Sequence, residues 1–293
     1  MNVKITSDST CDLSPELIAV NDIGIVALAV EMGGKYYHDG VDITPAEIFS
    51  HVDRGGALCS TSAVNADEYE QFFAPYAEAY DAVVHINLGS GFSSCYQNAC
   101  IAAEHFENVF VIDSQNLSTG QGHVVLEACR MAAKCESMDD VKAMCGDLRE
   151  LTTRVEASFL LDRLDYMAKG GRCSSVAALG ANLLKLKPCI EVFEGKMRVC
   201  KKYRGNYGKC LANYALDRLK DRPDIIRDRL FITYTPVTDQ QLKDVVDAVA
   251  QCEPFQNVYQ TQAGCTVSCH CGPGTLGVLF IRKKEEKEKS VDS

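Results

Sequence analysis

The chain has 293 residues, of which 46% are hydrophobic, and its formal net charge at pH 7 is −10. That length predicts two domains, and the acidic balance argues against nucleic acid as a main partner. Hydrophobic runs such as 23–30 and 276–281 are far shorter than the ~20 residues that span a bilayer, and residues 1–8 do not resemble a secretory signal. We therefore expect a cytoplasmic protein without a transmembrane segment, whose fifteen cysteines are reduced thiols.

The first half of the chain alternates short apolar runs with amphipathic stretches, which is typical of βαβ units. Strands are predicted at 3–5, 83–88 and 109–112. Helix starts are predicted where capping residues occur, at Ser14-Pro15, Thr44 with Glu47, Asn65 with Glu68, and Ser137. Gly33-Gly34 predicts a hairpin turn. Together these signals indicate an α/β/α domain with a mainly parallel sheet over residues 1–153.

The pattern changes after the helix that ends near Thr152. Predicted strands then alternate with helices, and Glu194-Gly195 is typical of a hairpin turn. The strands are expected at 155–161, 187–192, 197–203, 231–234 and 275–281. This pattern indicates an α+β domain with a mainly antiparallel sheet over 154–285, followed by a frayed, charged tail at 286–293.

Small hydroxyl-bearing residues follow several predicted strands of the first half. In an open parallel sheet such loops meet at the carboxyl ends of the strands, where ligands bind. Any one of these side chains could be a helix cap, but four loops together predict a binding crevice. The residues are Asp8, Ser9 and Thr10; Ser60, Thr61 and Ser62; Ser90, Ser93 and Ser94; and Asp113 and Ser114.

Ser93 and Ser94 open a predicted helix after a glycine-rich turn. Backbone N–H groups and hydroxyls at such a helix start can receive a carboxylate or a phosphate. A dinucleotide is an alternative, because Gly89-x-Gly91-x-x-Ser94 follows a strand and Asp113 lies downstream. The third glycine of that fingerprint is absent, however, and the strand is not the first of its unit.

His270 lies in the turn-rich segment 268–274, just before the last predicted strand. Three interpretations compete: a metal ligand together with Cys265, Cys269 and Cys271, an ordinary loop histidine, and a ligand of an anionic head group. The cysteine spacing does not match that of common zinc sites. We favour the head-group role and expect no metal and no cofactor.

A hydrolase or acyltransferase that uses Ser93 and His270 is the alternative enzymatic interpretation. The Gly-x-Ser-x-Gly elbow is missing, because Gly91-Phe92-Ser93-Ser94-Cys95 stands in its place. No Walker loop occurs either, so the sequence does not predict autonomous phosphoryl transfer. A binding protein without catalytic activity is the simplest expectation.

The ordered set of motifs resembles the DegV family of bacterial fatty-acid-binding proteins over nearly the whole chain. The motifs are residues 6–13, 61–62, 90–93 with 96–99, 112–114, 169–172, 183–188 and 270–274. The resemblance implies a fatty acid between the two domains, with its carboxylate held by Thr61, Ser62, Ser93 and His270, and with Ser94 adjoining them. Asp8, Ser9, Ser90, Asp113 and Ser114 would support this site.

The resemblance also implies a partner: a separate fatty acid kinase, related to dihydroxyacetone kinases, to which the carrier presents the acid. Residues 165–210 contain ten Lys or Arg but only three Asp or Glu, although the chain as a whole is acidic. By this resemblance Arg172, Lys201, Lys202 and Arg204 are candidates for the surface that docks this kinase or for positions beside the head group. Arg172 could equally pair with a core carboxylate. The chain departs from the family pattern at Ala63-Val64, where Gln-Pro is usual, and at Ser94-Cys95, where Gly-Thr is common.

Overall fold

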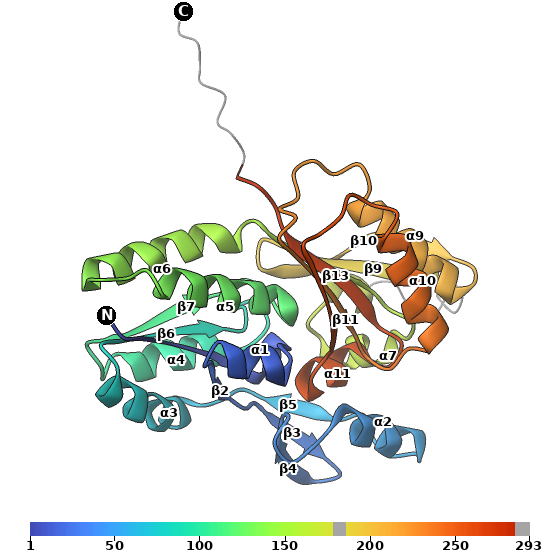
Figure 1. Cartoon of the computed structure of the whole chain (residues 1–293). Coiled ribbons are helices and arrows are strands. Elements are labelled where there is room, and N and C mark those ends of the chain that lie inside the picture. The colour runs from blue at the N-terminus through green and yellow to red at the C-terminus, as the bar shows by residue number, and fades with distance from the viewer. Residues whose placement is uncertain (178–185, 285–293) are drawn as a thin grey trace, which may run out of the picture.

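The first half of the molecule is a parallel sheet between two layers of helices. The computed structural model describes residues 1–177 and 186–284. Helices α3 (Ala66–Ala79) and α4 (Cys95–Ala103) cover one face of the sheet, and α5 (Thr119–Ala132) and α6 (Met138–Thr152) cover the other (Figure 1). The strand order is β2 (Gly24–Val26), β1 (Val3–Asp8), β6 (Ala82–Asn87) and β7 (Val109–Asp113). The predicted α/β/α arrangement is confirmed.

Local capping signals place the helix starts in this half. The Ser14 hydroxyl accepts from the backbone of α1 (Pro15–Val20), and Thr44 and Glu47 close a capping box at α2 (Pro45–Asp53). Asn65 caps α3 and Ser137 caps α6 in the same way. Because each cap satisfies N–H groups that a helix end leaves unpaired, these boundaries follow from the local sequence.

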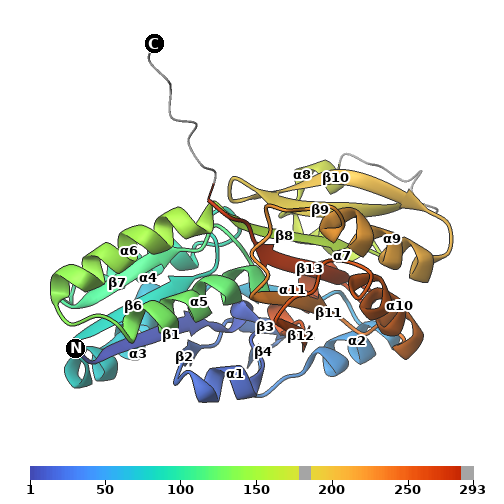
Figure 2. The same cartoon turned by 45° about the horizontal axis from the view of Figure 1, so that its top comes forward.

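The second half forms a six-stranded mixed sheet (Figure 2). All neighbouring strands are antiparallel except β11 and β12, which are parallel. The strand order is β10 (Lys196–Arg204), β9 (Leu186–Phe193), β8 (Val155–Leu160), β13 (Leu276–Ile281), β11 (Arg229–Tyr234) and β12 (Asn257–Gln262). The predicted, mainly antiparallel sheet is confirmed, although the polar edge strand β12 was not predicted.

Helix α5 lies between the two sheets and joins their cores. It is buried along nearly its whole length. Val124 and Ala128 belong to the same hydrophobic cluster as Phe231, Leu279 and Ile281 of the six-stranded sheet. The opposite face of that sheet is covered by α9 (Tyr207–Leu219) and α10 (Asp239–Val249). The predicted boundary at residues 153 and 154 falls between α6 and β8, and the division into two domains there remains a prediction.

A small antiparallel sheet and α2 form the lower part of the molecule in Figure 1. Its strands are β3 (Ala29–Met32), β4 (Lys35–His38) and β5 (Ser60–Ser62), and Gly33-Gly34 makes the predicted hairpin turn with φ of 61° and 79°. The prediction that residues 60–62 form a loop at the edge of the parallel sheet was wrong. They pair with β3 instead.

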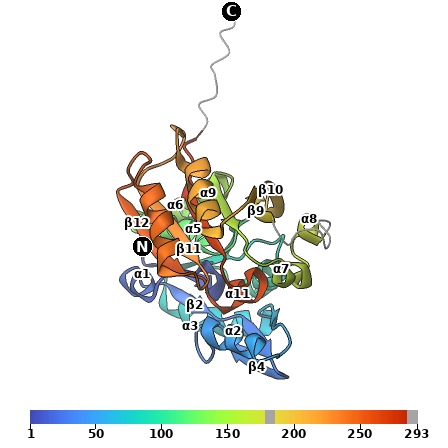
Figure 3. The same cartoon turned by 90° about the vertical axis from the view of Figure 1, so that its right-hand side faces the viewer.

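The segment around His270 is a helix, α11 (Cys265–Cys271), so the expectation of a turn-rich loop was also wrong. Its first N–H groups are capped from far along the chain: Gly264 donates to Asp12, and Cys265 and Thr266 donate to Asp39. Figure 3 shows α11 between α7 (Asp165–Gly170) and the part of the molecule that contains β5 and α2. Gly272, with a φ of 73°, ends the helix.

The remaining short elements are the 3-10 turn Ser9–Cys11 and α8 (Ser174–Ala177). Across residues 1–177 and 186–284, no helix is long and apolar enough to cross a bilayer. Two parts of the sequence predictions, residues 183–185 of one family motif and the tail 286–293, lie outside the described residues.

Candidate functional site

A partly open cavity of about 170 Å³ lies where α7, α11 and β5 meet the loops before α4 and α5. Small-molecule sites are typically concave, with a few polar groups on a mostly apolar lining. We call the group of polar lining residues the polar end and the group farther along the lining the apolar end. The polar end consists of Thr10, Thr61, Ser62, Ser93, Ser94, Arg172, Thr266 and His270, and the apolar end of Leu117, Met167, Met197, Val267 and Cys271. Leu28, Ala63, Leu88 and Phe92 complete the lining.

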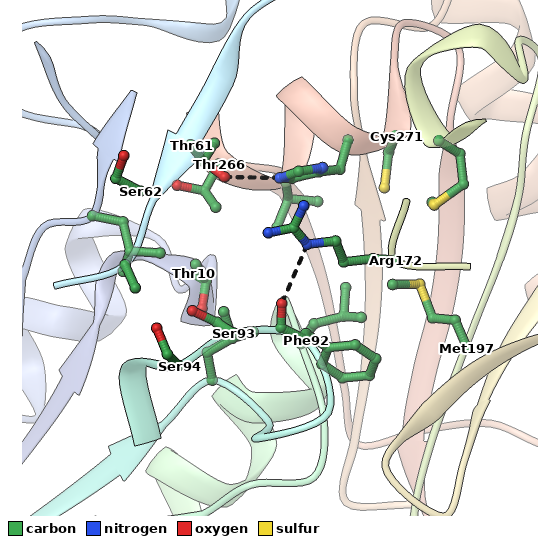
Figure 4. Close-up of a pocket in the computed structure, with 17 residues that line it drawn as sticks. Thr10, Thr61, Ser62, Phe92, Ser93, Ser94, Arg172, Met197, Thr266 and Cys271 are labelled. Atoms are coloured by element: carbon green, nitrogen blue, oxygen red, sulfur yellow. Dashed lines mark hydrogen bonds between the residues drawn. The ribbon is translucent and has the colours of Figure 1, made fainter. Parts of the chain in front are cut away.

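The polar end brings together the five head-group residues that the sequence predicted. Thr61, Ser62, Ser93, Ser94 and His270 all line the cavity. Figure 4 shows the hydroxyls of Ser62, Ser93 and Ser94 on one side, and Cys271 and Met197 on the other. These hydroxyls and sulfur-containing side chains thus lie on opposite sides of the cavity, as a ligand with a polar head and an apolar tail requires.

His270 is the most constrained side chain of the polar end. Its Nε2 lies 2.8 Å from Thr61 Oγ1, and its Nδ1 is buried without a hydrogen-bond partner among the described residues. Burial, with a smaller contribution from the Arg172 charge, lowers the pKa of His270 from 6.5 to about 4. The imidazole is thus neutral at pH 7, and it can donate from one nitrogen and accept at the other.

Gly170 provides the space that the imidazole occupies. A Cβ built on this glycine would lie 2.4 Å from His270 Nδ1, which is closer than real Cβ atoms come to any neighbour. Gly170 is the last residue of α7 and does not adopt the left-handed conformation. The glycine is therefore required by the close packing of α7 against His270 and not by backbone strain.

Arg172 supplies positive charge to the cavity. Its Nη1 donates to the Gly170 carbonyl at 2.7 Å and its Nε donates to the Phe92 carbonyl at 3.4 Å, the second of which is drawn in Figure 4. It is the one charged side chain among the residues that line the cavity in the described part of the chain. A single guanidinium beside a neutral imidazole and several hydroxyls suits a ligand with one negative charge.

Two threonines of the polar end were missed by the sequence analysis as head-group residues. Thr266 is buried, and its hydroxyl has no partner within the described residues, so it is free to bond a ligand. It precedes His270 by one helical turn, and a helix prediction here would have placed both on one face. Thr10 also lines the cavity, but its hydroxyl already contacts Asp8 at 2.5 Å and Gln121 at 2.8 Å.

The apolar end adjoins a second, much smaller cavity of about 30 Å³. Leu117, Val267 and Cys271 line both cavities. The second cavity lies against the six-stranded sheet, beside Phe159 and Leu279, and its exposed lining is almost wholly apolar. The two cavities are therefore separated by shared wall residues, on the side of the first cavity that faces this sheet.

The supporting residues predicted from the sequence do not line the cavity. Ser90 donates to Asp113, the Ser114 hydroxyl bonds the backbone of Asn116, and Ser9 bonds Asp39 and the backbone of Leu28. Asp8 supports the cavity lining indirectly, because its carboxyl group accepts hydrogen bonds from the backbone N–H groups of Thr10 and Leu88. Burial raises the pKa of this carboxyl. These residues hold the loops in place, as residues of caps and turns do.

The predicted basic residues separate into two places. Arg172 is at the cavity, whereas Lys201, Lys202 and Arg204 lie on the edge strand β10 and do not line it. Lys201 pairs with Asp217 at 2.6 Å. Lys202 and Arg204 are exposed, and neither forms an ion pair with any residue of the described ranges.

The geometry does not assemble the catalytic pair that a hydrolase needs. Ser93 Oγ lies 3.2 Å from both the Sγ and the backbone N of Cys95, whereas His270 pairs with Thr61. A nucleophilic serine requires a base within hydrogen-bond reach, and the His270 imidazole is engaged elsewhere.

The glycine loop before α4 also does not present the surface that a dinucleotide requires. A Cβ on Gly91 would lie 2.2 Å from the Gly195 carbonyl, and one on Gly89 would lie 2.8 Å from the Asn116 backbone N. These glycines therefore allow close contact with the chain's own backbone, and not with a pyrophosphate. Within residues 1–177 and 186–284, no group of three potential metal ligands is placed to bind a metal ion.

Comparison with known proteins identifies the family. The family model described as "Uncharacterised protein, DegV family" matches residues 2–283. A DegV domain-containing protein of Clostridium acetobutylicum is 34% identical over 289 residues, which cover 96% of this chain and 99% of that protein. This chain belongs to the DegV family. Another relative of this DegV protein, from Caldanaerobacter subterraneus, is 30% identical over 96% of this chain and 99% of its own length.

Solved structures of the family share the fold of this DegV protein. A DegV family protein from Thermus thermophilus, described by its fatty acid binding, has a TM-score of 0.86 and 28% identity, with 96% of this chain and all of the other covered. A stearic-acid-binding protein from Eubacterium ventriosum has a TM-score of 0.80 and 28% identity, with 96% and 98% covered. DegV of Bacillus subtilis, described as a fatty acid binding protein, has a TM-score of 0.79 and 24% identity, with 97% and 100% covered, and shows the fold alone.

Proposed function

We propose that this protein binds one long-chain fatty acid, with the carboxylate at the polar end of the cavity and the acyl chain at the apolar end. The observation that carries the proposal is the lining of the cavity, which combines hydroxyls, an imidazole and a guanidinium with aliphatic and sulfur-containing side chains and adjoins a second, apolar cavity. The two relatives described as binding a fatty acid or stearic acid at 28% identity support it.

The energetics favour such a ligand. Burial of about fifteen methylenes at ~0.8 kcal/mol each offers on the order of 12 kcal/mol before the costs of association. The carboxylate would lose its water, so it needs hydrogen bonds inside the cavity. Thr266, whose hydroxyl has no partner among the residues that the structure describes, and Arg172 can supply them. The acyl chain would provide affinity, and the polar end would select a single acidic head.

The protein would act as a carrier and not as a catalyst. Its chemistry supports this role, because Ser93 and His270 do not form a nucleophile and base pair. A separate, dihydroxyacetone-kinase-like fatty acid kinase would then phosphorylate the bound acid. The exposed Lys202 and Arg204 on the edge strand β10 are the candidate docking residues for it. The hydroxyls at the polar end exceed what one carboxylate requires, so an acyl phosphate could also be held there.

Mass spectrometry of lipid extracted from the protein, purified under native conditions from bacteria, tests the binding proposal. We expect stoichiometric long-chain fatty acid. Displacement of a fluorescent fatty acid from delipidated protein then measures affinity, and Arg172→Gln should weaken it while the exposed Arg204→Gln should not. Absence of lipid together with no binding of the fluorescent acid would refute the proposal, and ester hydrolysis that is lost in Ser93→Ala would support an enzyme instead.

A further inference from the structure

Two cysteines lie side by side next to the polar end of the cavity. Cys59 directly precedes β5, and Cys269 directly precedes His270 in α11. Both belong to one buried hydrophobic cluster that also contains Cys265 and residues of α2. Along the extended segment 59–62 the side chains alternate, with Cys59 and Thr61 turned inward and Ser60 and Ser62 exposed.

A hydrogen bond between Thr61 and His270 joins the same two segments, β5 and α11. The two atoms are 2.8 Å apart, and both residues lie close to the cysteine pair in the sequence. Cys59 is two residues before Thr61 on the same side of the chain, so it faces α11 as Thr61 does. The two thiols therefore interact beside the Thr61 and His270 pair, within the same buried cluster.

The two thiols also differ in acidity. The interaction with the Cys269 thiol is the largest influence on the pKa of Cys59 and lowers it. Burial and the Glu31 charge act in the opposite direction, and the nearby charge of Lys169 lowers the pKa further. Lys169 is fixed at this place, because its Nζ donates to the carbonyl of Leu58 at 2.6 Å. The Cys59 interaction and burial raise the pKa of Cys269. Cys59 is therefore the more reactive thiol and Cys269 its resolving partner.

We propose that Cys59 and Cys269 are an oxidation site, a dithiol that closes to an intramolecular disulfide and clamps β5 to α11 beside the polar end of the cavity. With hydrogen peroxide as oxidant, the Cys59 thiolate attacks one peroxide oxygen, which breaks the O–O bond and leaves a sulfenic acid and, after protonation, one water. The Cys269 sulfur then attacks the sulfenic sulfur and loses its proton to the departing hydroxide, which leaves as a second water. Two thiols thus supply the two electrons that reduce one peroxide to two waters.

The disulfide would restrain the residues that hold the ligand. Thr61 and Ser62 come from β5, and Thr266 and His270 come from α11. A covalent bond between these two segments opposes any separation of β5 from α11 during ligand exchange. We expect oxidation to slow fatty acid exchange by about tenfold or more, mainly through the dissociation rate. This second step rests on the proposed function, whereas formation of the disulfide does not.

The test uses the full chain with Cys200→Ser as background, because Cys200 is exposed and contacts the carbonyl of Cys189, where it offers a competing thiol pair. The protein is treated with an equimolar amount of hydrogen peroxide, and the remaining thiols are alkylated. Peptide mapping by mass spectrometry should find Cys59 joined to Cys269. Release of a fluorescent fatty acid is then followed by stopped flow before and after oxidation, and again after dithiothreitol.

The expected result is a Cys59–Cys269 peptide, slower release and full recovery with dithiothreitol. Cys59→Ala should abolish both effects, and circular dichroism and thermal unfolding must show that this variant is folded. If peroxide leaves Cys59 and Cys269 as thiols in the folded Cys200→Ser protein, or joins either to another cysteine, the oxidation site is refuted. A disulfide that leaves the release rate unchanged refutes the clamp alone. A mapped disulfide in a protein that binds no fatty acid would retain the oxidation site and count against the proposed function.

Discussion

Replacing Gly170 by alanine tests whether the packing of α7 positions His270. Gly170 ends α7 without adopting the left-handed conformation, so intrinsic preference alone favours alanine there. In an open position such a change would stabilise the helix by about 0.5–1 kcal/mol. The new Cβ, however, would lie 2.4 Å from His270 Nδ1, and real Cβ contacts are essentially never under 3.0 Å. The imidazole or α7 must therefore move by at least 0.6 Å, the difference between these two distances.

A shift of this size disturbs the 2.8 Å contact between His270 Nε2 and Thr61 Oγ1. Loss of one such hydrogen bond costs about 0.5–1.5 kcal/mol. Since 1.4 kcal/mol corresponds to a factor of ten, Gly170→Ala should weaken fatty acid binding by about two- to tenfold and should not stabilise the fold.

The measurement is displacement of a fluorescent fatty acid, together with thermal unfolding of the delipidated protein. Gly146→Ala is the matched control, because Gly146 lies within α6 and a Cβ there meets nothing within 4 Å. The control should be more stable than wild type and should bind normally. If Gly170→Ala behaves like Gly146→Ala in both assays, the argument that Gly170 positions His270 is wrong.

Three further predictions concern the cavity and its surroundings. Burial lowers the folded-state pKa of His270 from 6.5 to about 4, so as the pH falls through this window the unfolded chain gains a proton that the folded chain does not. When the pH is lowered from 7.5 to 5, the free energy of unfolding measured with urea should therefore fall by up to about 2 kcal/mol more in wild type than in His270→Gln. Cys271→Phe, at the wall shared by the two cavities, should weaken binding of long acids by about fourfold for each methylene excluded and spare short acids, as measured with a chain-length series. Charge reversal at Lys202 and Arg204 should leave fatty acid affinity within about twofold of wild type, because neither residue lines the cavity.

Each of these predictions has a distinct contrary result. If the free energy of unfolding depends on pH equally in wild type and in His270→Gln, the folded protein does not lower the pKa of this imidazole. If Cys271→Phe reduces the affinity for acids of all chain lengths equally, the acyl chain lies elsewhere. A large loss of affinity on reversing Lys202 and Arg204 would connect β10 directly to the ligand.

The sequence was most informative where a structural cause is local. Thr44 with Glu47 and Asn65 with Glu68 form capping boxes within four residues, and the predicted helices begin where they do. Gly33 and Gly34 likewise form the hairpin turn by themselves, because both adopt the positive φ that the turn needs. The strand β12 has no such signal, because a polar edge strand exposed along most of its length lacks an apolar pattern.

Where the cause is distant, prediction failed. Residues 265–271 contain cysteine, threonine and serine, which are weak helix formers, so a turn was expected. Asp12 and Asp39 cap this helix from positions 252 and 226 residues earlier. Thr266 was missed as a head-group residue for the same reason, since only a helix brings it beside His270. The residues Ser9, Ser90, Asp113 and Ser114 were correctly placed near strand ends, but their hydroxyl and carboxylate groups are used within their own loops.

The remote capping of α11 affects the order in which the molecule can assemble. A seven-residue helix is marginal by itself in water, and this one depends on carboxylates that belong to the beginning of the chain. During synthesis the segment that carries His270 emerges after Asp12 and Asp39. Contacts between residues so distant in sequence form slowly. The polar end of the cavity should therefore be among the last parts of this fold to form, and it cannot form before residues 264–272 have been synthesised.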